Sequence, residues 1–79
     1  MIKFMQLNGQ VAEITLEHCW FGKQKFKVEQ VNVIEDDKRL GVILCGQEKF
    51  IYKNQLCEVE MDERMIMFAD NKLKISIKF

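Results

Sequence analysis

The sequence contains no proline, one histidine and only four scattered glycines in 79 residues. The glycines form neither a dinucleotide-binding G-x-G-x-x-G pattern nor a Walker-type phosphate loop. No low-complexity stretch, internal repeat or linker divides the chain, and its length predicts one domain over residues 1–79. A chain this short has a small core and no room for a cofactor domain beside a substrate domain.

Neither sign of charge is in excess, because twelve basic residues balance twelve acidic ones. Nucleic-acid-binding domains usually carry a basic excess, which this chain lacks. A net charge of zero gives little colloidal repulsion, so it favours association with a partner or with a second copy. The longest apolar run, residues 65–69, is too short to cross a bilayer, and we expect no membrane partner.

Three cysteines at irregular spacing, Cys19, Cys45 and Cys57, do not form a disulfide framework. This pattern favours a reducing, cytoplasmic location, with Cys45 and Cys57 as small core residues. His18 lies beside Cys19, but neighbours in a strand point to opposite faces, and no C-x2-C pair begins a zinc site. We therefore expect no metal, no cofactor and no enzymatic activity.

Alternation with a period of two is the main pattern that is present. Leu73, Ile75 and Ile77 alternate with polar residues up to the end of the chain, as in a strand with one buried face. Two-residue turns at Asp62-Glu63 and Asp70-Asn71 would pair Val59 with Ile66, and Ile66 with Ile75. The two registers agree, so the sequence predicts a three-stranded meander over residues 56–79.

The rest of the chain also predicts strands. A three-residue loop, Leu7-Asn8-Gly9, with Gly9 in a left-handed conformation, would set Phe4 opposite Ala12 and Ile2 opposite Ile14. A change of phase at Glu29-Gln30 indicates a bulge or corner, and Gly46-Gln47 suits a further turn.

The fold class is therefore all-β. We expect a small barrel or a strongly bent antiparallel sheet of about seven short strands. A short helix near residues 47–56 is the main alternative for that segment.

The C-terminal sheet contains a candidate protein-binding face. The register that buries Ile66 and Phe68 turns Met65 and Met67 to the other side. Methionine is an adaptable contact residue, and an apolar stripe with a charged rim is typical of interaction patches. Whether another part of the chain covers this stripe stays open. The residues of this candidate site are Met65, Met67, Glu58, Glu60, Lys72 and Lys74.

A second candidate site lies between two predicted strands, where aromatic residues alternate with lysines. Exposed rings stack on bases and lysines neutralise phosphates, as in barrels that bind single strands. The competing interpretation is that Trp20 or Phe21 caps the core. The residues of this site are Trp20, Phe21, Lys23, Lys25 and Lys27.

The sequence leads to two functional hypotheses. The first is a non-enzymatic interaction module that binds a protein partner or itself through the methionine face or an edge strand. The C-terminal strand is a candidate edge, because lysines such as Lys72, Lys74 and Lys78 often protect edges. The alternative is a single-stranded RNA- or DNA-binding barrel of the OB or Sm-like kind.

Overall fold

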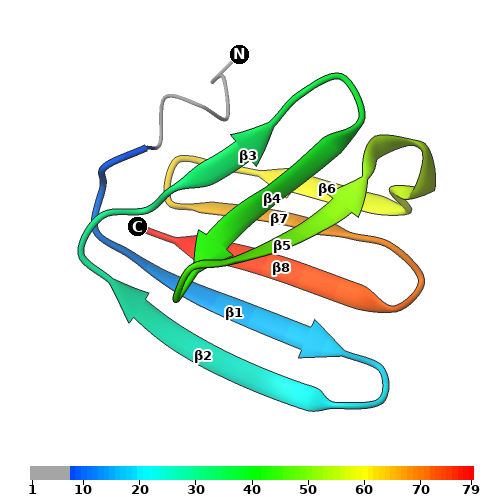
Figure 1. Ribbon diagram of the computed structural model, residues 1–79, viewed down its shortest axis with the longest axis horizontal. Helices are drawn as coiled ribbons and strands as arrows, with labels where there is room; N and C mark the ends of the chain where they lie inside the picture. Colours follow the sequence, from blue (N-terminus) through cyan, green and yellow to red (C-terminus); the bar gives the residue numbers. More distant parts are fainter. Residues whose placement is uncertain (1–7) are drawn as a thin grey trace.

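The structure, a computed structural model, describes residues 8–79, and nearly all the regular secondary structure in this part of the chain is β-strand (Figure 1). In chain order the elements are β1 (Ala12–His18), β2 (Gly22–Val28), β3 (Val33–Glu35), β4 (Arg39–Leu44), β5 (Gln47–Tyr52), η2 (Lys53–Gln55), β6 (Glu58–Met61), β7 (Met65–Ala69) and β8 (Leu73–Lys78). The all-β prediction is confirmed. In the segment 47–56, where a short helix was the alternative, the structure has β5 and one turn of 3-10 helix.

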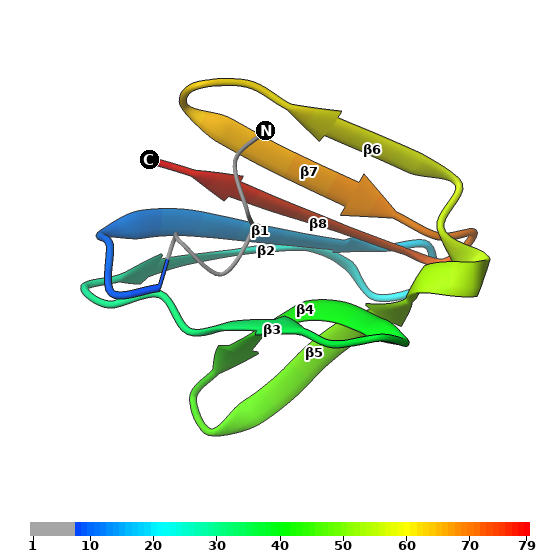
Figure 2. The same ribbon diagram turned by 90° about the horizontal axis from the view of Figure 1, so that it is seen from above.

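The strands form two antiparallel sheets that face each other (Figure 2). One sheet has five strands in the order β2-β1-β8-β7-β6, and the other has three in the order β3-β4-β5. The barrel expected as one of the two architectures is not closed, the expected single bent sheet is divided into two, and residues 8–79 form eight strands instead of about seven. The cause is the corner predicted at Glu29-Gln30, where the chain leaves β2 and crosses to β3 in the opposite sheet.

One apolar core fills the space between the two sheets. Alternate residues of β1, β7 and β8 meet residues of β3, β4 and β5, and Ile14, Phe68, Ile75 and Ile77 have no exposed surface. Each such side chain contributes about 1.5–3 kcal/mol relative to remaining in water. β6 lies at the side of the five-stranded sheet farthest from the three-stranded sheet (Figure 2).

The predicted meander is present as β6, β7 and β8, but its registers differ by two residues from the prediction. Val59 pairs with Phe68 instead of Ile66, and Ile66 pairs with Ile77 instead of Ile75. A shift of two keeps every side chain on its predicted face. The prediction of which side chains point to the inner face is therefore confirmed, and the prediction of their partners on the neighbouring strands is wrong.

Aspartate chemistry at the turns explains this shift. Asp62 Oδ1 accepts hydrogen bonds from the backbone N–H groups of Arg64 and Met65, both at 2.8 Å. Asp70 Oδ1 makes the same pair of bonds at 2.7 Å, and Asp36 does so in the β3–β4 turn. Each aspartate thus occupies the first position of its turn, whereas the sequence analysis had assumed the second position for Asp62 and Asp70.

The predicted N-terminal hairpin is wrong for the half that can be checked. Its first strand, with Ile2 and Phe4, lies outside the described residues. Ala12 pairs with Val28. Ile14 pairs with Phe26 on one side and Ile77 on the other, so β1 is an interior strand of its sheet. The left-handed conformation expected for Gly9 is observed, with φ of 85°.

The β4–β5 hairpin turns at Cys45-Gly46, not at Gly46-Gln47. Both residues have positive φ, 52° and 77°, as a two-residue type I′ turn requires. Leu44 therefore pairs with Gln47. The thiol of Cys45 is exposed, so the prediction that it belongs to the core is wrong.

Candidate interaction surface

The face of the five-stranded sheet that points away from the three-stranded sheet, here the outer face, carries ordered rows of charged residues. Glu13 lies between Lys27 and Lys78, and Glu17 lies between Lys23 and Lys74. Opposite charges in directly paired positions stabilise a sheet. The three rows are Lys27–Glu13–Lys78–Met65, Lys25–Thr15–Ser76–Met67–Glu60 and Lys23–Glu17–Lys74–Ala69–Glu58.

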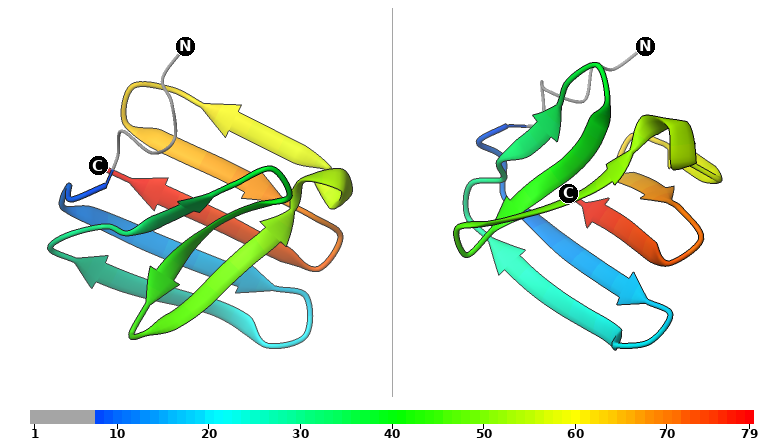
Figure 3. Two further views of the ribbon diagram at one scale, coloured as in Figure 1. Left: turned by 45° about the horizontal axis from the view of Figure 1, so that its top comes forward. Right: turned by 45° about the vertical axis from the view of Figure 1, so that its right-hand side comes forward.

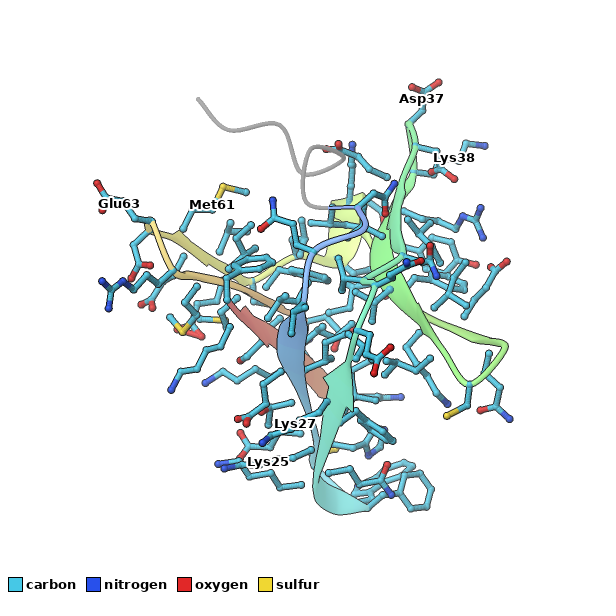
Figure 4. All side chains as sticks on the ribbon, turned by 90° about the vertical axis from the view of Figure 1, so that its left-hand side faces the viewer. Lys25, Lys27, Asp37, Lys38, Met61 and Glu63 are labelled. Atoms are coloured by element: carbon cyan, nitrogen blue, oxygen red, sulfur yellow. The ribbon has the colours of Figure 1, made fainter. Side chains whose placement is uncertain are left out.

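On the outer face, basic residues lie at one edge of the sheet and acidic residues lie at the other. β2 contributes only lysines to this face, and Lys25 and Lys27 point away from the three-stranded sheet (Figure 4). β6 contributes only Glu58 and Glu60. β2 and β6 lie on opposite sides of the sheet (Figure 3). The zero net charge of the chain therefore conceals one basic edge and one acidic edge.

The methionine row of the first candidate site is largely covered. Met67 lies on the outer face but is only 5% exposed, and Met65 is half-buried. Its paired neighbours are Glu60 and Ser76. Long charged side chains on such a face can shield apolar neighbours along their methylene stems. A partner would have to displace side chains to reach Met67, and the assignment of Met65 and Met67 to a binding site stays a prediction.

Three of the four charged members of the first candidate site, all except Glu60, gather at one end of the sheet. Glu58, Lys72 and Lys74 line one shallow depression, together with Lys23 from the second candidate site. Lys72 belongs to the β7–β8 turn rather than to a strand. The C-terminal strand predicted as an edge, β8, lies between β1 and β7, so that prediction is wrong and the edges are β2 and β6.

The aromatic residues of the second candidate site project from the β1–β2 turn. Trp20 is 75% exposed and Phe21 is 79% exposed, so neither caps the core. Their ring centroids lie 5.9 Å and 4.7 Å from that of His18. Lys72 Nζ lies 5.5 Å from the centre of the Trp20 ring, close enough for a cation–π contact.

The structure does not bring these rings together with the whole lysine row. His18 follows Ile14 and Leu16 in the inward phase of β1, and the two rings contact His18. Lys25 and Lys27 belong to the outer face instead. Only Lys72, from the first candidate site, meets Trp20 directly.

The cysteines and His18 form no recognisable chemical centre. The backbone N–H of Trp20 donates to Nδ1 of His18 at 3.0 Å. Within residues 8–79 no three His, Cys, Asp or Glu side chains group as metal ligands would. Cys57 is exposed, with Sγ 3.1 Å from Oδ1 of Asn71, so its predicted place in the core is wrong.

An exposed apolar strip on β6 was not recognised from the sequence. Val59 and Met61 are 49% and 47% exposed, although their paired neighbours Phe68 and Ile66 are buried. The alternating pattern placed Val59 and Met61 in the buried row. It could not show that β6 is an edge at the side farthest from the opposite sheet, and Figure 4 shows Met61 at the periphery.

The backbone of β6 is also open at the free edge. Asp62 N–H donates to the Met65 carbonyl at 2.9 Å, so hydrogen-bonded pairs with β7 recur at Glu60–Met67. In an antiparallel ladder the residues between such pairs direct their N–H and C=O groups the other way. Val59 and Met61 therefore present apolar side chains together with backbone groups that have no partner in the described part of the chain.

The strongest polar network lies on the three-stranded sheet, away from both candidate sites. Arg39 Nε lies 2.8 Å from Asp36 Oδ2, and its Nη1 lies 3.0 Å from Glu48 Oε2. The Lys38 backbone N–H and the Arg39 guanidinium lower the pKa of Asp36 to about 2. The hydrogen bond and charge of the Asp36 carboxylate, and to a smaller extent those of Glu48, raise the pKa of Arg39. This network fixes the β3–β4 turn.

Comparisons with protein-family models, with curated proteins and with solved structures found no match to this chain. Within residues 8–79 no helix has the length and apolar character needed to cross a membrane.

Proposed function

We propose that this domain is a non-enzymatic interaction module that binds a protein by adding a strand to the free edge of β6. The observation that carries the proposal is the exposure of Val59 and Met61 on an edge strand. Exposed edges template pairing with an extended chain, and alternate side-chain positions then provide specificity. Glu58 and Glu60, from the first candidate site, form the outer rim of this surface.

The proposal includes a reducing, cytoplasmic setting. All three cysteines are free thiols on the surface, where an oxidising compartment would expose them to disulfide exchange.

Amide hydrogen exchange tests strand addition directly. The probes are a synthetic peptide of the sequence of β2, GKQKFKV, and a scrambled peptide of the same composition. Added strands should slow exchange at Val59 and Met61, whose N–H groups face the edge, at least tenfold. Glu60, already paired with Met67, is the internal control. In protein diluted until it is monomeric, unchanged exchange at Val59 and Met61 with saturating peptide would refute strand addition.

A second function, binding of single-stranded nucleic acid, is supported by one specific observation. Trp20 and Phe21 are more exposed than any other large apolar residues of the described chain, and Lys72 lies over the Trp20 ring. Exposed rings stack on bases, and neighbouring lysines add salt-dependent affinity. The separation of Lys25 and Lys27 from these rings makes this the weaker proposal.

Fluorescence of Trp20, the only tryptophan, tests whether the domain binds single-stranded nucleic acid. Mixed-sequence single-stranded oligonucleotides should quench its emission at low salt, and added salt should reverse the quenching. A Lys72→Gln variant should weaken the quenching, whereas Lys49→Gln is the control on the other sheet. Emission that does not respond to oligonucleotide would remove this candidate function.

A further inference from the structure

The two edges of the five-stranded sheet match each other, which bears on the identity of the partner strand. Neither β2 nor β6 has a second strand neighbour within residues 8–79, and four successive antiparallel pairings make the two strands run in the same direction. A second copy placed beside the first, without rotation, would bring its β2 against β6 as a parallel strand. The proposed function requires only an added strand, and β2 is a candidate within the chain itself.

Hydrogen-bonding groups on the two edges have the phase that parallel pairing requires. Cys19 N–H donates to the Lys72 carbonyl, so alternate residues of β1 bond to β8 and the others bond to β2. Lys23, Lys25 and Lys27 therefore direct their backbone groups to the free edge of β2. On β6 the residues that face the edge are Val59 and Met61. In a parallel ladder, a residue whose backbone groups face the partner strand lies opposite a residue whose backbone groups face its own sheet. The alternation on β2 and β6 allows this arrangement.

Side-chain faces select a register. With Val59 opposite Phe26 and Met61 opposite Val28, half-buried and exposed apolar residues meet on the inner side. The same register sets Glu58 opposite Lys25 and Glu60 opposite Lys27 on the outer face. A shift by one residue would set charged residues opposite apolar ones.

Symmetric pairings of the same edges are disfavoured by charge. Two copies related by a two-fold axis would pair β6 with β6, opposing Glu58 and Glu60 to the same two glutamates. Pairing β2 with β2 would oppose lysines to lysines. Like charges directly opposite each other destabilise a sheet. Edge charges usually prevent association, but here the charges on the two edges have opposite sign.

We propose that β6 binds β2 of a second copy, in parallel, with Glu58 against Lys25 and Glu60 against Lys27. This inference rests on the proposed function, since it names the partner of the β6 edge. Such a contact is heterologous, so it extends copies into a chain, or a ring if the rotation closes, rather than a two-fold dimer.

Charge reversal at each edge tests the contact. In sedimentation velocity, the wild-type average mass should rise with concentration beyond twice the monomer mass. Glu58→Lys/Glu60→Lys and Lys25→Glu/Lys27→Glu should each remain monomeric, because each has two edges of one sign. An equimolar mixture of the two variants, and one chain carrying all four substitutions, should assemble again. Lys38→Glu/Lys49→Glu, on the other sheet, is the control with an equal charge change and should assemble like the wild type.

Each alternative result is informative. A monomeric wild type, a plateau at twice the monomer mass, or assembly that survives Lys25→Glu/Lys27→Glu would overturn head-to-tail pairing. Restored assembly in the mixture also excludes misfolding as the cause of loss in the single-edge variants. If the wild type stays monomeric while the β2 peptide protects Val59 and Met61, strand addition at β6 stands and the second copy is excluded. If the peptide also fails to protect them, both proposals fail.

Discussion

At the scale of single residues, the two methionines of the outer face should respond differently to a charge. Met67→Glu would place a carboxylate in a 5% exposed position beside Glu60, and we expect destabilisation of about 3 kcal/mol or more. Met65 is half-buried and lies opposite Lys78, so Met65→Glu should change the free energy of unfolding by less than about 1 kcal/mol. Urea unfolding of both variants measures the difference, and equal losses would contradict the burial described for Met67.

The carboxylate of Asp36 should make stability depend on pH in the acid range. Its pKa falls from 3.8 to about 2 on folding, because backbone N–H and Arg39 bonds favour the charged form. The stabilisation is fully present above about pH 4 and is lost as the pH falls toward 2. Asp36→Asn should therefore show a shallower loss of stability between pH 4 and pH 2 in urea unfolding.

Asp37→Asn is the matched variant for that experiment, since it removes a charge from the same turn without touching the Arg39 contact. Identical pH slopes for Asp36→Asn and the wild type would show that the Asp36–Arg39 pair is not formed in solution.

The turn aspartates should contribute to stability through their paired backbone bonds. Asp62→Ala removes the acceptor for the N–H groups of Arg64 and Met65, and we expect a loss of about 1 kcal/mol. Glu63→Ala, in the middle of the same turn, should change stability by less than about 0.5 kcal/mol. Thermal unfolding followed by circular dichroism compares the two. A larger effect at Glu63 would contradict the turn assignment.

At the scale of strands, the close approach of β4 and β5 depends on a single glycine. A Cβ at Gly41 would overlap the carbonyl oxygen of Lys49 and the Cα of Phe50. Because backbone atoms cannot move aside as a side chain can, Gly41→Ala should cost about 3 kcal/mol or more.

Gly46→Ala separates steric overlap from backbone conformation. Gly46 has open space around it but a φ of 77°, so alanine there should cost only about 1–2 kcal/mol. If both alanine variants were equally stable, the packing of β4 on β5 would have to be revised.

The alternation of side chains was readable from the sequence, whereas the exact pairing was not. Ile66, Phe68, Ile75 and Ile77 point inward as predicted, because the period of a strand depends only on neighbouring residues. Their partners were misassigned by two residues because an aspartate side chain can shift a turn by one position.

Strand order depends on contacts between distant residues, which no local pattern reports. Nothing near Ile14 indicates that its second neighbour is Ile77. For the same reason β8 was predicted to be an edge and the exposure of Val59 was missed. The charged residues of the candidate sites were found from composition and spacing, but their separation into a basic and an acidic edge needed the order of all five strands.

At the scale of the whole molecule, salt should weaken the proposed association of copies. Raising the ionic strength to 1 M shortens the Debye length to about 3 Å, which screens the Glu58–Lys25 and Glu60–Lys27 attractions. The average mass in sedimentation at a fixed protein concentration should therefore fall between low and high salt. Association that strengthens with salt would indicate a purely apolar contact and remove charge from the explanation.

The pairing of β1 with β8 also bears on how the protein is made. Glu13 pairs with Lys78, so β1 lacks its second neighbour, β8, until almost the last described residue has been synthesised. Contacts between residues this distant in sequence form slowly. Strands with unpaired edges are prone to aggregation until those contacts form. A ribosome stalled before residue 73 would hold a nascent chain with Ile14 and Leu16 on an open strand. The yield of folded protein should then depend on chaperones and translation speed as much as on the stability of the finished domain.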